Sequence, residues 1–106
     1  ALAPGNLAIA VLDNERYGET GMQPTHTAGE TDLAAIAAAA GIPVTGTAHD
    51  AKELEHTQND LRGTTGPVFY VIKVRAEELP VVLPPRDGAW LKDRFRMALL
   101  GNAALE

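Results

Sequence analysis

The sequence predicts an α/β fold with three layers, in which a parallel sheet is flanked by helices. Three short apolar runs, at residues 7–13, 44–48 and 67–74, alternate with stretches of helical periodicity. Strands that alternate with helices along a chain are joined by right-handed crossovers and lie parallel in one sheet. The first run is also continuously apolar, as in strands that are buried on both faces.

The composition limits the classes of function. The chain has 106 residues, of which 45% are hydrophobic, enough for one small domain. A net charge of −5 argues against a general nucleic-acid partner, which needs a basic face. With no cysteine, disulfides and thiolate sites are excluded. The apolar runs are too short for a membrane span and no signal-peptide pattern is present, so we expect a cytoplasmic protein that binds no membrane.

The first half of the chain predicts a strand, a long polar loop and a helix. The strand at 7–13 is followed by a loop at 14–30 that is rich in Gly, Thr and Pro, and such long loops are often functional. Thr31 is the expected N-cap of the helix, with Asp32 in its first turn. Gly41 is expected to end the helix. Its expected apolar face is Leu33, Ile36, Ala37 and Ala40.

The second helix and the third strand follow the short strand at 44–48. Asp50 and Glu53 have the spacing of a capping box, and Gly63 is expected to end this helix. Its thin apolar stripe consists of Ala51, Leu54 and Leu61. The run at 67–74 is β-branched and aromatic, which makes it the strongest strand signal in the chain.

The last part of the chain predicts an extended segment and a final helix. Residues 79–85 are rich in proline, Asp87 can cap a helix at about 88–100, and Gly101 can close it. The expected inner face is Leu91, Phe95, Ala98 and Leu99. Three strands leave the edges of a parallel sheet exposed, so we expect the chain to pair with another chain or to belong to a larger domain.

A candidate site lies where the first strand ends, at Asp13-Asn14. In open α/β sheets, ligands bind beyond the carboxyl ends of the strands. An asparagine side-chain oxygen is a hard, neutral ligand that suits Mg²⁺ or Ca²⁺. A sharp turn after Asn14 would aim the carbonyl of Arg16 toward the same point. The alternative is an ordinary turn, which Asx residues commonly start.

Several segments together resemble the thiamine diphosphate-dependent enzymes. The stretch AVLDNERYGETGMQPT, which follows PGN, resembles the second half of the cofactor-binding motif of this family. The segments DLAAIAAAAGI, GPVFYVIKV and LPPRDGAWLKDRFRMALLG resemble the rest of the diphosphate-binding domain. The resemblance is strongest to the sulfopyruvate and phosphonopyruvate decarboxylase branch. It implies that residues 1–106 are a single partial domain, the C-terminal portion of a thiamine diphosphate-binding domain.

The resemblance implies roles for five consecutive residues. Asn14 matches the asparagine whose side chain binds Mg²⁺, and Arg16 matches the position whose backbone carbonyl binds the same ion. Glu15, Tyr17 and Gly18 match the loop that wraps the cofactor diphosphate. No residue of this chain matches a catalytic group of the family.

Three further residues match positions near the substrate. Gly21 lets the chain turn closely. Gln23 belongs to the TG-x-Q segment of this branch and is expected to face the mouth of the active site, and His26 lies in the loop that follows. Across the sequence, no pair of histidines has the spacing of a helical zinc site.

The implied function is part of a thiamine diphosphate- and Mg²⁺-dependent decarboxylase of a 2-oxo acid, inactive as this chain alone. The Gly-Asp-Gly that opens the family motif does not occur in the thirteen residues before Asn14. The expected partners are therefore the Gly-Asp-Gly segment and the pyrimidine-binding domain or subunit, in a homo- or hetero-oligomer. We expect the chain to be a proteolytic remnant, a truncated version or one piece of a split enzyme.

Two alternatives remain open at this point. One is a non-catalytic α/β module that binds a ligand or another protein. The other is a carboligase of the acetolactate synthase type, since these enzymes share the same half of the motif.

Overall fold

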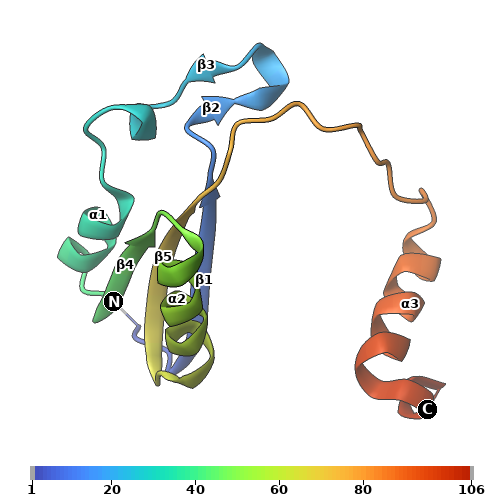
Figure 1. Ribbon diagram of the computed structural model, residues 1–106. Coiled ribbons are helices and arrows are strands. Elements are labelled where there is room, and N and C mark those ends of the chain that lie inside the picture. Colours follow the sequence, from blue (N-terminus) through green and yellow to red (C-terminus); the bar gives the residue numbers. More distant parts are fainter. Residues whose placement is uncertain (1, 106) are drawn as a thin grey trace.

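A parallel three-stranded sheet forms the centre of the molecule. A computed structural model describes residues 2–105. The strands β1 (Asn6–Asp13), β4 (Val44–Ala48) and β5 (Gly66–Lys73) lie in the order β1-β5-β4, with both pairs parallel. Figure 1 shows β5 between the other two. The predicted α/β class is confirmed, and β1 and β4 are the exposed edges that three strands imply.

The two helices that connect the strands cover opposite faces of the sheet. The hydroxyl of Tyr70 on β5 donates a hydrogen bond to Asp60 of α2 (Ala51–Gly63). The next residue, Val71, lines a cavity together with Leu33 of α1 (Leu33–Ala39). Because successive side chains of a strand point to opposite faces, α1 and α2 lie on different sides. This gives the three predicted layers.

The core of the sheet is small and is built from small side chains. Among the described residues the buried apolar side chains are those of Ala34, Ala37, Ala48, Pro67, Val68 and Val71. Small side chains on α1 let that helix approach the sheet closely. The predicted face of α1 is partly wrong, because Ile36 is 56% exposed while Ala34 is buried. In α2 the buried residue is Thr57, and Leu54 of the predicted stripe is exposed.

Local signals set the ends of α1 and α2. The N-cap of α1 is Asp32, whose side chain accepts a hydrogen bond from the Ala35 N–H, so the prediction of Thr31 is wrong by one residue. Gly41 follows α1 with a φ of +93°, as predicted. Asp50 caps α2 as predicted and accepts from the Glu53 N–H, but the Glu53 carboxylate accepts from the N–H of His49, one residue before the position that a capping box uses.

The long polar loop after β1 has structure of its own. A hairpin of β2 (Arg16–Tyr17) and β3 (Gln23–Pro24) encloses a short 3₁₀ turn, η1 (Gly18–Thr20). A second turn, η2 (His26–Ala28), leads toward α1. Figure 1 shows this hairpin beyond the carboxyl ends of β1 and β5.

The last helix, α3 (Gly88–Leu100), stands apart from the sheet, followed by η3 (Gly101–Leu105) (Figure 1). Asp87 caps it and Gly101 ends it, as predicted. Its expected inner face meets no sheet, because Phe95 and Leu99 are 64% and 66% exposed. The radius of gyration is accordingly 17.3 Å, against about 13 Å for a compact domain of this length.

Within residues 2–105, the helices are all too short or too polar to cross a membrane.

Candidate functional site at the carboxyl edge of the sheet

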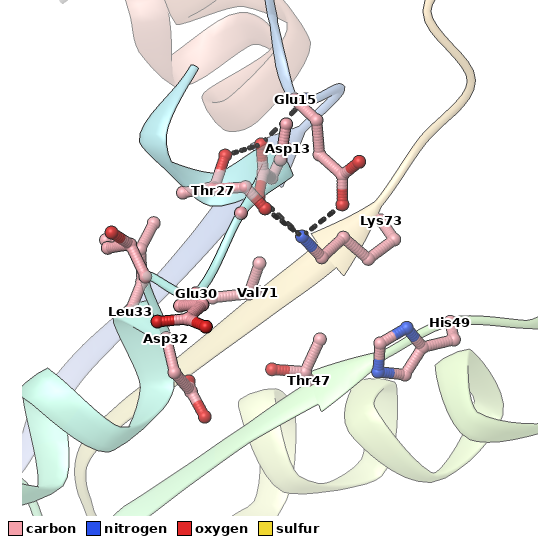
Figure 2. A pocket seen from close by; sticks show the side chains of 13 residues that line it. Asp13, Glu15, Thr27, Glu30, Asp32, Leu33, Thr47, His49, Val71 and Lys73 are labelled. Carbon is pink, nitrogen blue, oxygen red and sulfur yellow. Dashed lines mark hydrogen bonds and ion pairs between the residues drawn. The ribbon is translucent and has the colours of Figure 1, made fainter. Parts of the chain in front are cut away.

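The carboxyl ends of β1 and β5 bring two opposite charges together. The parallel register places Asp13 beside Lys73. The ammonium nitrogen of Lys73 lies 2.9 Å from Oδ2 of Asp13 and 2.7 Å from Oε1 of Glu15. Asp13 is only 8% exposed, so this pair is better shielded from water than a surface ion pair. Lys73 therefore bridges two carboxylates at the end of the central strand (Figure 2).

Asp13 also forms hydrogen bonds to both ends of the polar loop. Its Oδ1 accepts hydrogen bonds from the Glu15 N–H at 2.9 Å and from the Thr27 hydroxyl at 2.8 Å. The Thr25 N–H donates to the Glu15 carbonyl at 3.0 Å, which closes the base of the hairpin. One buried carboxylate thus fixes where the loop leaves the sheet and where it returns.

The charges of this cluster are stabilised by its hydrogen bonds. Burial alone would raise the pKa of Asp13, but the bonds from Lys73, the Glu15 N–H and Thr27 together hold that pKa below its usual value. The bonds to Glu15 and Asp13 raise the pKa of Lys73, and burial only partly opposes them. Asp13 is therefore ionised and Lys73 protonated at neutral pH.

Asn14 forms a turn at the edge of the sheet. Its side-chain oxygen accepts the Arg16 N–H at 3.0 Å, which is the Asx turn of the simpler prediction. An amide oxygen has two lone pairs, so one is left for a cation. Glu15 has a φ of +59°, a left-handed conformation that is uncommon for residues other than glycine. The Asn14–Arg16 hydrogen bond and the left-handed Glu15 together describe a tight turn that is fixed by hydrogen bonding.

The Arg16 carbonyl is also suited to bind a cation. Because the Thr25 N–H donates to the Glu15 carbonyl, Arg16 and Pro24 form a non-hydrogen-bonded pair, in which the Arg16 carbonyl points away from β3. Among residues 2–105, no group of three or more His, Cys, Asp or Glu side chains could hold a metal. A cation here would need oxygens from Asn14, from the backbone and from a ligand. Mg²⁺ is commonly bound in this way, through few protein ligands and the oxygens of substrate phosphates.

The remaining predicted residues lie along the hairpin. Tyr17 is on β2, Gly18 begins η1, and Gly21 ends it with a φ of +113°. Gln23 bonds to Thr20 through both ends of its amide, at 2.6 and 3.0 Å, so its side chain folds onto the hairpin itself. His26 begins η2 and is exposed. Substrate contacts by Gly21, Gln23 and His26 stay predictions.

A cavity of about 290 Å³ lies beside the Asp13–Lys73 pair, on the α1 face of the sheet (Figure 2). Of the predicted site residues, Glu15 lines it. Its charged and polar side chains include Asp13, Glu15, Thr27, Glu30, Asp32, Thr47, His49 and Lys73. Carboxylates outnumber the lysine, so an anionic ligand would need a cation as companion.

Lys73 is the site residue that the sequence analysis missed. It is the one charged residue in the apolar run at 67–74, where it is the next-to-last residue. A charge at the end of an otherwise buried strand is the signal that could have identified it, since ligands bind at these strand ends.

Fold and site together define an α/β domain whose sheet carries a polar, hydrogen-bonded turn at its carboxyl edge. The chain is similar to the sulfopyruvate decarboxylase subunit beta of Methanothermobacter thermautotrophicus, with 35% identity over 95 residues. The matched region covers 90% of this chain and 48% of the relative, so the chain spans about half the length of the curated relative it matches. No family model matches the chain, and no solved structure gives a significant match.

Proposed function

We propose that this chain is part of a thiamine diphosphate- and Mg²⁺-dependent enzyme that decarboxylates a 2-oxo acid of the sulfopyruvate or phosphonopyruvate type. The observation that carries the proposal is the position of Asn14, directly after β1 at the carboxyl edge of a parallel sheet. The similarity to a decarboxylase subunit over 90% of the chain supports it.

In this proposal the turn after β1 holds the metal and the diphosphate. The Asn14 amide oxygen and the Arg16 carbonyl bind Mg²⁺, and Glu15, Tyr17 and Gly18 border the diphosphate. When bound, the cofactor supplies the electron sink for decarboxylation. The residues of this chain bind and orient its diphosphate end. Mg²⁺ and Lys73 offset the repulsion that Asp13 and Glu15 exert on a diphosphate.

The rest of the site would come from outside these residues. The aspartate of the Gly-Asp-Gly segment and the groups that bind the cofactor pyrimidine would be supplied by another segment or by a partner subunit, in a cytoplasmic oligomer. The exposed edge strands β1 and β4 are compatible with such an assembly.

Calorimetry with thiamine diphosphate in the presence of Mg²⁺ tests the proposal, using the full-length protein in its native assembly. We expect Asn14→Ala to weaken Mg²⁺-dependent binding at least about tenfold, since it removes a metal ligand. Asn59→Ala makes the same chemical change on an exposed position of α2 and serves as the matched control.

Three results would decide against it. If Asn14→Ala binds like the wild type, the metal assignment is wrong. If the wild-type assembly shows no Mg²⁺-dependent binding, the proposed function is wrong. If the loaded assembly releases no CO₂ from sulfopyruvate or phosphonopyruvate but condenses pyruvate, the enzyme is a carboligase.

A further inference from the structure

We propose that Lys73 is a positioning residue that holds the Asn14 turn in the geometry needed to bind the metal and diphosphate. This inference rests on the proposed function and adds a residue to it. Lys73 makes no bond to Asn14 or Arg16 in the described structure; its bonds are to Asp13, to Glu15 and, at 3.5 Å, to the Thr27 carbonyl. It therefore acts through the neighbours of Asn14.

The two carboxylates that Lys73 binds flank Asn14 in the sequence. Asp13 precedes it and Glu15 follows it, so one ammonium group fixes the chain on both sides of the metal-binding position. Figure 2 shows the Lys73 nitrogen between these carboxylates. The distances of 2.9 and 2.7 Å are those of charge-assisted hydrogen bonds. The turn cannot shift away from the sheet without breaking one of them.

The anchor stands on the central strand of the sheet. Lys73 ends β5, which is hydrogen-bonded to β1 on one side and to β4 on the other. Val71, two residues earlier, is buried. A site held from the central strand is positioned more precisely than one held from a loop.

Glu15 shows why the turn needs an anchor. A glutamate at a φ of +59° persists only where its surroundings hold it. Four bonds do so here: Glu15 donates its N–H to Asp13, its carbonyl accepts from the Thr25 N–H and from the Arg16 guanidinium, and its carboxylate binds Lys73. Lys73 supplies the side-chain bond directly and also holds the Asp13 carboxylate that receives the Glu15 N–H. Without Lys73, two carboxylates on either side of Asn14 lose their shared counter-charge and repel each other.

The test uses the full-length protein in its native assembly and two measurements. Calorimetry with thiamine diphosphate and Mg²⁺ is expected to show about tenfold weaker binding for Lys73→Met, the loss typical of residues that orient metal ligands. Lys73→Arg keeps the charge and is expected to restore most of the binding. Lys52→Met, the same change on an exposed position of α2, is the control.

Amide hydrogen exchange without cofactor or metal is the second measurement. We expect Lys73→Met to lose protection at the amides of Glu15, Arg16 and Thr25, while the amide of Val71 inside β5 keeps it. This measurement separates a positioning role from general unfolding. Lys73→Gln provides the same comparison if Lys73→Met folds poorly.

The outcomes distinguish the inference from the function on which it rests. If the wild type binds, Asn14→Ala does not, and Lys73→Met binds normally, the inference is overturned and the proposed function stands. If Lys73→Met binds weakly but keeps protection in the turn, Lys73 acts by its charge alone and the positioning role is overturned. If the wild type does not bind, the proposed function and the inference both fail.

Discussion

Asp13 and Lys73 form an ion pair across the carboxyl ends of two adjacent parallel strands, although 60 residues separate them in the sequence. The pair connects the sheet to the loop that follows β1, since the same aspartate also accepts bonds from Glu15 and Thr27. The Asp13 side chain therefore contributes both to the stability of the sheet and to the geometry of the candidate site.

Replacement of Asp13 by alanine is expected to destabilise the fold by about 2–4 kcal/mol, because Lys73 and two other donors lose their acceptor in a shielded site. Urea denaturation followed by circular dichroism measures this. Asp93→Ala is the control: it breaks the exposed Lys92–Asp93 pair at 3.1 Å and should change stability by less than about 1 kcal/mol. Equal effects of the two variants would contradict the role of Asp13.

The hydrogen bond from Tyr70 to Asp60 is expected to stabilise the fold less at high pH. The hydrogen bond to Asp60 is the largest cause that raises the pKa of Tyr70 to about 12, and burial is the next largest. The unfolded chain has the ordinary value of 10.0. Because the folded state holds the proton more tightly, this contribution is complete below pH 10 and is lost as the pH rises to about 12.

The free energy of unfolding of the wild type and of Tyr70→Phe, measured between pH 8 and pH 12, checks this sign. The difference between the two proteins should shrink as the pH rises. A difference that is constant over this range would mean that the hydroxyl of Tyr70 does not donate to Asp60.

Gly46 on β4 is required by the packing of Tyr70. A Cβ at this position would lie 2.5 Å from Cε1 of the Tyr70 ring. Gly46→Ala is therefore expected to destabilise the fold by about 1–3 kcal/mol through overpacking. Gly63→Ala, at the end of α2, meets no atom within 4 Å and should be neutral or stabilise by up to about 1 kcal/mol. Thermal unfolding of both variants provides the comparison.

Substitutions of Val68 and Phe95 are expected to distinguish the core of the sheet from the exposed helix α3. Val68 is 1% exposed on the central strand, and Val68→Ala should destabilise the sheet by roughly 2 kcal/mol. Phe95 lies on α3, away from the sheet, and Phe95→Ser should leave the unfolding of the sheet nearly unchanged. Hydrogen exchange of the β5 amides measures both. Strong loss of protection in Phe95→Ser would show that α3 packs on the sheet.

The site could be predicted only in part. A resemblance in the residues after β1 pointed to Asn14 and Arg16, and the structure places both in a held turn at the edge of the sheet. The cation that holds this turn, Lys73, was not found, because its partners are 58 and 60 residues away in the sequence. Their pairing depends on strand order and register, which cannot be inferred from a local sequence pattern.

The sequence by itself determined the elements. Apolar runs, the caps at Asp50 and Asp87 and the glycines at helix ends act within a few residues, so they are readable from the chain. Tertiary structure decided that α1 buries Ala34 rather than Ile36. It also decided that α3 leaves its apolar face uncovered. Periodicity identifies an apolar face, but only the arrangement of the other elements in space determines what that face contacts.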